Sequence, residues 1–357
     1  MFGASNFPLA FSTAGGDTAA ALAAGCPVVV KGHSAHPGTG EIVAEAILAA
    51  SAACGIPAGV FSLIQGGRRD VGQALVQHPL INAVGFTGSL AGGRALFDLC
   101  ATRPHPIPFF GELGSVNPMF ILPGACTTRG GAIGAGWATS LTMGAGQFCT
   151  NPGIAVVMAG AEGDALVAAA AAALGQVAPQ TMLTEGIAAA YRAGKARFDG
   201  IDGVTPVMVS EQSGRMAGPN LYQTDAETYR RNPSLSEEVF GPLGLIIRVS
   251  DLADMTRLAR SFEGQLTATL HMDAGDTAVA QRLLPVLERM AGRILVNGFP
   301  TGVEVADSMV HGGPYPASTN FGATSVGTLS IRRFLRPVCY QNFPDALRPD
   351  DIAVSGR

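Results

Sequence analysis

Short apolar runs alternate along the first third of the chain with longer segments in which small and apolar residues recur at helical spacing. The run at 27–31 is rich in β-branched residues, which is typical of a strand buried in a parallel sheet. The next segment, 38–53, predicts a helix that Thr39 can cap. Such alternation indicates an open parallel α/β sheet. The predicted strands are 27–31, 60–64, 83–87 and 108–113, and the predicted helices are 17–24, 38–53, 70–77 and 89–99.

A second set of elements begins near residue 115. The motifs indicate a domain boundary there, although the composition does not change. The helix expected over 130–144 is rich in Gly and Ala, so it can pack closely on its neighbours. At roughly 150 residues per domain, 357 residues correspond to about two domains. The predicted strands are 154–158, 243–249, 266–270 and 293–297, the predicted helices are 162–175, 251–262 and 274–291, and 310–327 is a loop rich in Gly, Pro, Ser and Thr.

Charge and cysteine content exclude several classes of protein. The net charge is −4, so there is no basic field to hold nucleic acid or an anionic membrane, and no long apolar run predicts a membrane span. The six cysteines form no CxxC pair, which favours a reducing cytoplasm. His33 and His36 have no carboxylate or cysteine at ligand spacing, so we expect no metal.

One cysteine stands out as a candidate nucleophile. Cys149 lies in the heptapeptide GAGQFCT at 144–150, just after a predicted helix and a double-glycine turn. Glycine lets the backbone approach a ligand, and a thiol there can attack an electrophilic carbon while its N–H faces the resulting oxyanion. The alternative is a buried structural cysteine, which is the commoner case for a cysteine taken alone.

Three further motifs could carry chemistry. Glu112 ends a strand in an apolar, Gly-flanked setting suited to a general base, or it is a loop carboxylate bonded to backbone. The turn at 85–89, GFTGS, could hold a pyrophosphate at a helix N-terminus, although it is not the G-x-G-x-x-G fingerprint and could be an ordinary turn. Lys31 follows a strand, where α/β sheets bind ligands, and Glu238 lies beside a rigid Gly-Pro turn.

In their order along the chain these motifs resemble the NAD(P)-dependent aldehyde dehydrogenase family. Three segments, at 31–37, 309–316 and 331–341, are similar to its NADP-type 2,5-dioxovalerate (α-ketoglutarate semialdehyde) dehydrogenases. The resemblance implies an α/β fold with a Rossmann-type cofactor domain and an α/β catalytic domain. The motifs that carry it are Asn6-Phe7-Pro8, the strand end at Lys31, the turn at 85–89, Glu112-Leu113-Gly114, Gly146-Gln147-x-Cys149 and Glu238-Val239-Phe240-Gly241-Pro242.

The resemblance also implies roles for the site residues. Cys149 would attack the aldehyde, Asn6 and the Cys149 N–H would hold the oxyanion, and Glu112 would activate the water that releases the acid. The expected product from 2,5-dioxopentanoate is 2-oxoglutarate. The residues expected to bind the cofactor are Lys31, Ser34, Arg69, Gly85, Thr87, Gly88, Ser89, Glu238 and Phe240.

We expect NADP to be preferred, with NAD also possible. Many NAD-using members have a Glu at the position of Ser34, where it binds the ribose hydroxyls and would repel a 2′-phosphate. Ser34 does not repel it, and Arg68 or Arg69 can add positive charge. His311 and Tyr315 are expected near the substrate, and Arg332, Arg333 or Arg336 could meet a carboxylate or be plain surface charge.

The chain departs from the family at its start, where members carry a further segment before the Asn-Phe-Pro motif. We therefore expect residues 1–113 to be an incomplete NADP-binding domain, 114–334 a catalytic domain, and 335–357 an oligomerisation strand and tail, with the strand near 338–343. A homo-oligomer is expected for the full-length enzyme.

Two other functions stay open at this point. The chain could be a catalytically silent fragment that binds dinucleotide or partner subunits, as the short start favours. It could also be an acylating enzyme that passes the thioester to coenzyme A, although relatives of that type typically lack the base that Glu112 would supply.

Overall fold

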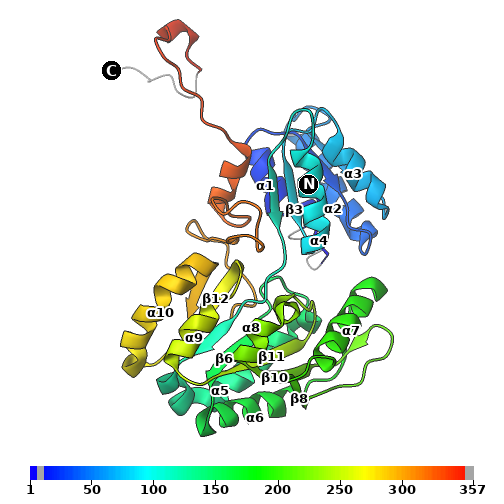
Figure 1. Ribbon diagram of the computed structural model, residues 1–357. Helices are drawn as coiled ribbons and strands as arrows, with labels where there is room; N and C mark the ends of the chain where they lie inside the picture. Colours follow the sequence, from blue (N-terminus) through cyan, green and yellow to red (C-terminus); the bar gives the residue numbers. More distant parts are fainter. Residues whose placement is uncertain (6–11, 350–357) are drawn as a thin grey trace.

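A computed structural model describes residues 1–5 and 12–349 of the protein (Figure 1). Two pairs of parallel strands form its first unit. The segment Met1 to Gly3 runs between β1 and β3 and joins the two pairs, because the Phe2 amide donates to the Gly85 carbonyl and the Gly3 amide to the Lys31 carbonyl. The order across this unit is therefore β2, β1, residues 1–3, β3 and β4. The strands are β1 (Val28–Lys31), β2 (Phe61–Ile64), β3 (Val84–Thr87) and β4 (Phe109–Glu112).

Helices cover both faces of these strands, as the sequence pattern predicts. On one face α1 and α2 bury a small core around Val30 and Phe61. On the other face α3 and α4 pack around Val84 and Phe109. The helices are α1 (Gly16–Ala23), α2 (Pro37–Ala53), α3 (Arg69–Gln77) and α4 (Leu90–Ala101).

A larger sheet forms the second unit, in the order β13-β12-β5-β6-β11-β10-β8. Its strands are parallel except β8, which runs antiparallel to β10. The strands are β5 (Met119–Ile121), β6 (Ile154–Met158), β8 (Thr205–Met208), β10 (Asn220–Asp225), β11 (Leu243–Val249), β12 (Gln265–His271) and β13 (Ala291–Val296), and a separate short pair is β7 (Gln180–Thr181) with β9 (Met216–Ala217).

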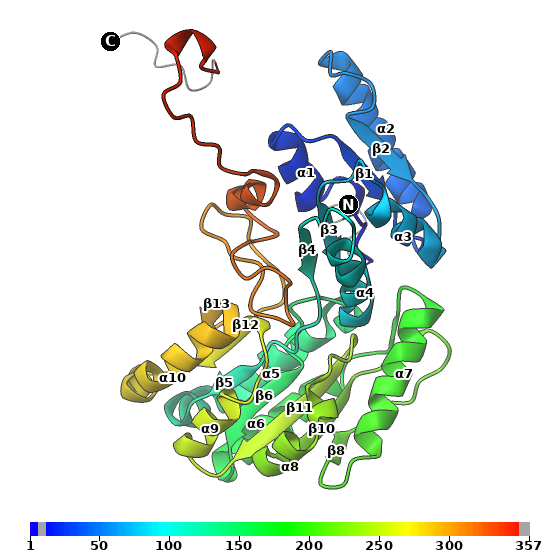
Figure 2. The ribbon, with the colours of Figure 1, turned by 45° about the horizontal axis from the view of Figure 1, so that its top comes forward.

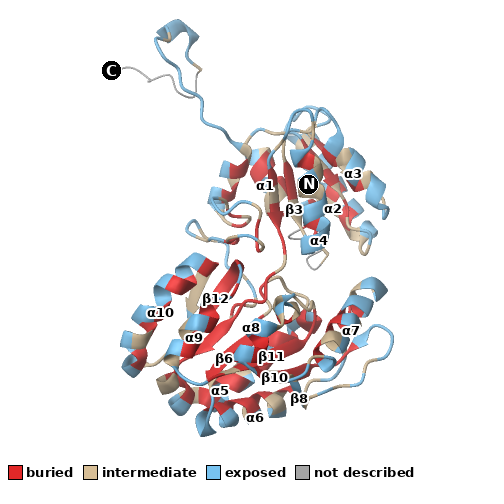
Figure 3. Cartoon of the chain, viewed as in Figure 1, coloured by how far each residue is buried: buried red, intermediate tan, exposed pale blue. Residues whose placement is uncertain are grey.

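Buried side chains fill both faces of this sheet, while the outer helix faces are exposed (Figure 3). The face with Trp137 is covered by α5 and α6, which approach closely because Gly134 faces the Leu166 carbonyl, where a Cβ would lie 2.6 Å from its oxygen. The helices are α5 (Pro123–Thr142), α6 (Ala161–Leu174), α7 (Glu185–Asp199), α8 (Ala226–Arg231), α9 (Leu252–Ala259) and α10 (Thr277–Met290), with 3-10 turns η2 (Met143–Gly146), η3 (Pro233–Ser236), η4 (Ala274–Asp276), η5 (Thr328–Phe334) and η6 (Asp345–Leu347).

The loop predicted over 310–327 connects the two units, and Figure 2 shows it between them. It runs antiparallel beside β4: the Leu113 amide donates to the Ala317 carbonyl, the Thr319 amide donates to the Gly111 carbonyl, and Glu112 pairs with Ser318. Beyond the loop, η5 packs on α1, where Arg333 and Asp17 form a buried ion pair at 2.6 Å.

One prediction about this region is corrected. Residues 338–343 form no strand; they lie in an exposed tail that leaves the body of the protein (Figure 1). Arg333, a candidate for meeting a substrate carboxylate, pairs through Nη1 with Asp17, while its Nη2 is buried without a hydrogen-bond partner among the described residues. Its side chain lines a pocket with Glu112 and His311, so this candidate stays a prediction. No helix in the described ranges has the length and apolar character needed to cross a membrane.

Candidate active site

Cys149 follows a tight turn whose left-handed backbone favours glycine. In η2 the backbone of Gly144 and Ala145 is left-handed, with φ of 57° and 58°, and Gly146 follows at 68°. Gly146 also lies against Gly241, where a Cβ would come within 2.3 Å of the carbonyl carbon. This contact fixes the cysteine turn against the loop that carries Glu238.

Two asparagines hold the backbone on either side of Cys149. Asn117 is fully buried and its Nδ2 donates to the carbonyls of Cys149, at 2.8 Å, and of Asn151, at 2.9 Å. Asn151 in turn donates to the Gly146 carbonyl at 2.7 Å. The side-chain oxygen of Gln265, on β12, accepts a hydrogen bond from the backbone N–H of Asn117 at 3.0 Å, so the turn is anchored to the large sheet.

Glu112 is the last residue of β4 and is buried. Its two carboxylate oxygens have different partners, both supplied by the loop paired with β4. His311 Nε2 lies 3.0 Å from Oε1, and the Ser325 hydroxyl donates to Oε2 at 2.8 Å.

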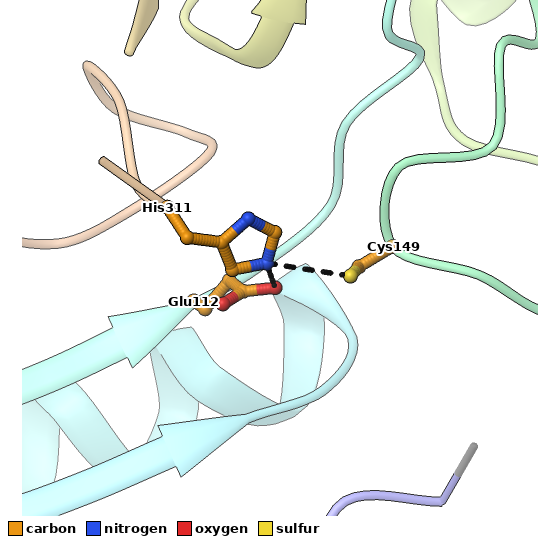
Figure 4. Close-up of side chains that lie close together, drawn as sticks. All are labelled: Glu112, Cys149 and His311. Carbon is orange, nitrogen blue, oxygen red and sulfur yellow. Dashed lines mark hydrogen bonds and ion pairs between the residues drawn. The ribbon is translucent and has the colours of Figure 1, made fainter. Parts of the chain in front are cut away.

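His311 also reaches the cysteine. Its Nε2 lies 3.5 Å from Cys149 Sγ (Figure 4), and a carboxylate oxygen of Glu112, the Cys149 sulfur and a ring nitrogen of His311 all lie within 4.8 Å of one another. Figure 4 shows the three side chains converging from separate elements: Glu112 from β4, Cys149 from the turn after α5, and His311 from the connecting loop. A nucleophile, a carboxylate and an imidazole in mutual contact can attack a carbonyl carbon and move protons around it.

Burial and charge set the protonation of these groups. Burial raises the pKa of the Cys149 thiol well above its ordinary value, and the negative charge of Glu112 raises it further. Burial also acts to raise the pKa of Glu112, but the interactions with His311 and Ser325 outweigh it and lower that pKa. Glu112 is therefore a carboxylate at neutral pH while Cys149 is a thiol.

Glu238 is a second carboxylate near the first. Burial, and then repulsion from Glu112, raise the pKa of Glu238 to about 8. Its side chain lies against Gly114, where a Cβ would be 3.1 Å from Oε2, and it lines a pocket together with Gly146 and Phe240. The pocket therefore joins the cysteine turn to the Gly-Pro loop.

Comparisons with known proteins show which family the chain is similar to. The chain matches the aldehyde dehydrogenase family over residues 2–333. It is 55% identical over 357 residues to the alpha-ketoglutaric semialdehyde dehydrogenase 2 of Azospirillum brasilense, covering 99% of this chain and 68% of that protein. It is 50% identical to an alpha-ketoglutaric semialdehyde dehydrogenase of Acinetobacter baylyi, covering 98% of this chain and 67% of that protein.

The chain belongs to the aldehyde dehydrogenase family.

Solved structures of the same fold include a 3,6-anhydro-L-galactose dehydrogenase in complex with NAP, with a TM-score of 0.77 and 24% identity over 94% of this chain and 68% of that one. Another is a glyceraldehyde-3-phosphate dehydrogenase from Methanocaldococcus jannaschii complexed with NADP, with a TM-score of 0.75 and 21% identity over 89% of this chain and 67% of that one. These likenesses confirm the predicted α/β fold with its parallel sheets.

Several predicted cofactor residues lie at or just after the carboxyl ends of the small strands, whereas Glu238 and Phe240 lie in the Gly-Pro loop before β11. Lys31 ends β1, and Ser34 follows in a turn that the next loop approaches, since a Cβ on Gly67 would lie 3.5 Å from the Ser34 Cβ. Arg69 begins α3 and is exposed. Thr87 ends β3 opposite Glu112 in the register, so the predicted cofactor residue Thr87 and Glu112 end neighbouring strands.

The turn after β3 continues this edge. Gly88 donates its amide to the Glu112 carbonyl at 3.1 Å, and Ser89 caps α4 by accepting from the Gly92 amide. Gly85 differs from the others, because it is buried where a Cβ would lie 2.6 Å from Asp17 Oδ2. Packing accounts for this glycine, and Thr87 and Gly88 stay predicted ligand contacts. Asn6, the expected oxyanion donor, lies outside the described residues.

The contacts that two side chains of the site make were not predicted from the sequence. His311 was expected near the substrate, but the structure places it on both Cys149 and Glu112. Ser325 was not singled out at all. The sequence signal for His311 was its place in a loop rich in Gly and Pro. The pairing of that loop with β4 is a long-range contact, and the spacing of residues along the chain does not reveal it.

The pKa shifts predict how the thiol reacts. Because the charge of Glu112 raises the pKa of Cys149, the substitution Glu112→Gln should increase the thiolate fraction at pH 8 and speed alkylation of Cys149 by iodoacetamide. In the wild type the rate should still be rising with pH above 9. The measurement is the rate of modification of the Cys149 peptide by mass spectrometry, with the exposed Cys54 as internal control. An unchanged or slower rate in the Gln variant would show that Glu112 does not govern this thiol.

Proposed function

We propose that this site oxidises a short dicarboxylic semialdehyde, 2,5-dioxopentanoate, to 2-oxoglutarate, with NADP as the electron acceptor. The contact of Cys149 with Glu112 and His311 carries the proposal, because aldehyde oxidation through a thioester needs a nucleophile and a base at one carbon. The substrate follows from the identity of 55% and 50% to proteins named for alpha-ketoglutaric semialdehyde.

The first step is attack of the Cys149 sulfur on the aldehyde carbon. The S–H bond breaks and a C–S bond forms, giving a thiohemiacetal. Since the thiol contacts His311 Nε2, which in turn lies 3.0 Å from Glu112 Oε1, the Glu112–His311 pair is in place to take the proton. The Cys149 N–H, with Asn6 as the resemblance implies, would hold the oxyanion.

Bound NADP⁺ supplies the acceptor for the hydride that leaves the thiohemiacetal carbon. The residues present fit such a ligand: Gly88 and Ser89 form the N-terminus of α4, which suits a pyrophosphate. Lys31 and Ser34 lie after β1 in the same unit, where Lys31 would hold the adenosine ribose. Glu238 and Phe240 line the pocket next to the cysteine turn, where they would position the nicotinamide ribose.

Glu112 then works as the base of the second half-reaction. Once the proton taken in the first step has passed to solvent, Glu112 is ionised again, as it is at neutral pH, and can take a proton from a water molecule whose oxygen attacks the thioester carbon. The C–S bond breaks, the acid leaves, and the Cys149 thiolate regains a proton from the Glu112–His311 pair. Ser325 keeps one carboxylate oxygen occupied, which leaves the oxygen next to His311 to face the reaction.

The activity test compares two variants with wild type. With 2,5-dioxopentanoate and NADP⁺ the chain should form NADPH. Cys149→Ala should reduce kcat by about 1,000-fold or more, because the covalent route is lost. Cys54→Ser is the matched control, since Cys54 is exposed and should be silent. Activity retained in the Ala variant would exclude Cys149 as nucleophile. A chain that NADPH stabilises thermally but that forms no NADPH would indicate a dinucleotide-binding protein instead.

The cofactor preference has its own support in the first unit. Ser34 is exposed and carries no charge, and Arg69 lies at the start of α3, beyond Gly67, which approaches Ser34. Arg68 is paired with Asp70 at 2.7 Å, so Arg69 is the better partner for a 2′-phosphate.

Substitution at position 34 tests this assignment. Ser34→Glu should lower the ratio of kcat/KM for NADP over NAD about tenfold or more, through repulsion of the 2′-phosphate. Ser34→Ala, which removes the hydroxyl without adding charge, is the control and should change the ratio less. A wild-type chain that clearly prefers NAD, or a Glu variant with an unchanged ratio, would overturn the NADP proposal.

We also propose a reducing cytoplasm and association between copies. The six cysteines are all unpaired, which suits a reducing compartment. The exposed tail after η5 presents Leu335, Val338 and Tyr340 to solvent, and apolar tails of this kind are commonly covered by another subunit.

A further inference from the structure

The cluster of Cys149, His311 and Glu112 combines donors that metal ions prefer. We propose that these three side chains bind a soft divalent cation of the Zn²⁺ type, and that the bound ion reversibly blocks the enzyme. The binding proposal stands on the geometry alone, while the inhibition rests on the function proposed above.

The spacing of the ligand atoms fits a tetrahedral ion. The three atoms lie within 4.8 Å of one another, with Cys149 Sγ and His311 Nε2 3.5 Å apart and Nε2 and Glu112 Oε1 3.0 Å apart. Bond lengths of about 2.3 Å to sulfur and about 2.0–2.1 Å to nitrogen place the two atoms about 3.5 Å apart around tetrahedral zinc. The sulfur–nitrogen edge therefore already matches, the nitrogen–oxygen edge of 3.0 Å must lengthen by a few tenths of an ångström, and the sulfur–oxygen edge lies within the 4.8 Å that spans the three atoms.

The donor set selects the type of ion. A thiolate and an imidazole favour Zn²⁺ and its neighbours over Mg²⁺ and Ca²⁺, which prefer oxygen ligands. Three protein ligands leave a fourth position for water. Within residues 1–5 and 12–349 no other group of three His, Cys, Asp or Glu side chains meets the same spacing.

The surroundings hold two of the ligands in place. Ser325 donates to the second oxygen of Glu112, which is the kind of outer-shell bond that orients metal ligands. Asn117 fixes the backbone of Cys149. His311 is less well supported: with an ion on Nε2 its ring proton moves to Nδ1, which is buried without a hydrogen-bond partner in the described chain. The site should therefore bind zinc more weakly than a dedicated structural site does.

Occupation would disable each catalytic group at once. The thiol loses its proton to solvent and its sulfur becomes a ligand, so it cannot attack an aldehyde. Glu112 would be bound to the ion and could no longer take a proton from water. One proton released and one ion bound per chain is the expected balance.

Cobalt provides the direct test, because Co²⁺ occupies zinc sites and a thiolate bound to it absorbs in the near ultraviolet. The full chain is titrated with CoCl₂ and then with ZnCl₂, which should bleach the absorption. We expect one ion per chain and a thiolate-to-cobalt band. His311→Ala should weaken zinc binding about 100-fold or more, since loss of an outer-shell partner alone costs about 10–100-fold.

Two controls guard against misfolding and adventitious thiols. Alkylating Cys149 in wild-type protein should abolish the band without any mutation. The double variant Cys54→Ser/Cys339→Ser removes the exposed cysteines and should leave the band intact. A band that survives alkylation of Cys149, zinc binding unchanged in His311→Ala, or no binding at all would overturn the site.

Activity measurements distinguish failure of the metal site from failure of the proposed aldehyde oxidation. Micromolar ZnCl₂ should stop NADPH formation, and EDTA should restore it, while MgCl₂ should have no effect. A chain that binds Co²⁺ on Cys149 but oxidises no aldehyde would refute the proposed function and leave the metal site standing. An active chain that binds zinc on Cys149 without losing activity would refute the inhibition.

Discussion

The pairing of β4 with the segment at 317–319 is the interaction on which the active site depends. Glu112 ends β4, and its two oxygens are satisfied by His311 and Ser325, which lie on either side of that segment. Without the pairing Glu112 would be a buried carboxylate with no partners, which is costly. The same hydrogen bonds attach β4 of the first unit to the loop that connects the two units, so Glu112 lies where the first unit meets that loop.

Charge balance in this buried space explains how one site can hold two carboxylates and a thiol. Glu112 is kept ionised by its partners, and its charge then raises the pKa of both Cys149 and Glu238. At neutral pH the site therefore carries one negative charge of the three that are possible. A bound cation, whether nicotinamide or a metal ion, would favour the thiolate that this arrangement otherwise suppresses.

Much of the fold could be predicted from local pattern. The bounds of β6 and β11 agree with the predicted strands 154–158 and 243–249, because both are apolar runs between clear breaks. Other elements escaped for physical reasons. β5 has three residues, and the start of α5 lies at Pro123, a good first helical residue that precedes the Gly-rich pattern by seven positions. β10 contains Asn, Gln, Thr and Asp, and it is recognisable as a strand only through its neighbours in the sheet.

The candidate site also has some residues that could be predicted from the sequence and others that could not. Cys149 and Glu112 were found because glycines mark their turns, and the structure brings the two together. The position of His311 on both of them, and the bond from Ser325, depend on a pairing between residues some 200 positions apart in the chain. Gly85 was interpreted as a ligand contact because the turn motif includes it, whereas its neighbours Met1 and Asp17 show that packing requires it.

The central claim is that Cys149 forms the covalent intermediate and that Glu112 releases it. The most direct measurement is the mass of Glu112→Gln protein quenched within one turnover after mixing with 2,5-dioxopentanoate and NADP⁺. We expect a burst of about one equivalent of NADPH and an acyl group on the Cys149 peptide. The acyl group should persist because the glutamine of the variant cannot activate the water that hydrolyses the thioester. A burst without an adduct, or an adduct on another cysteine, would contradict it.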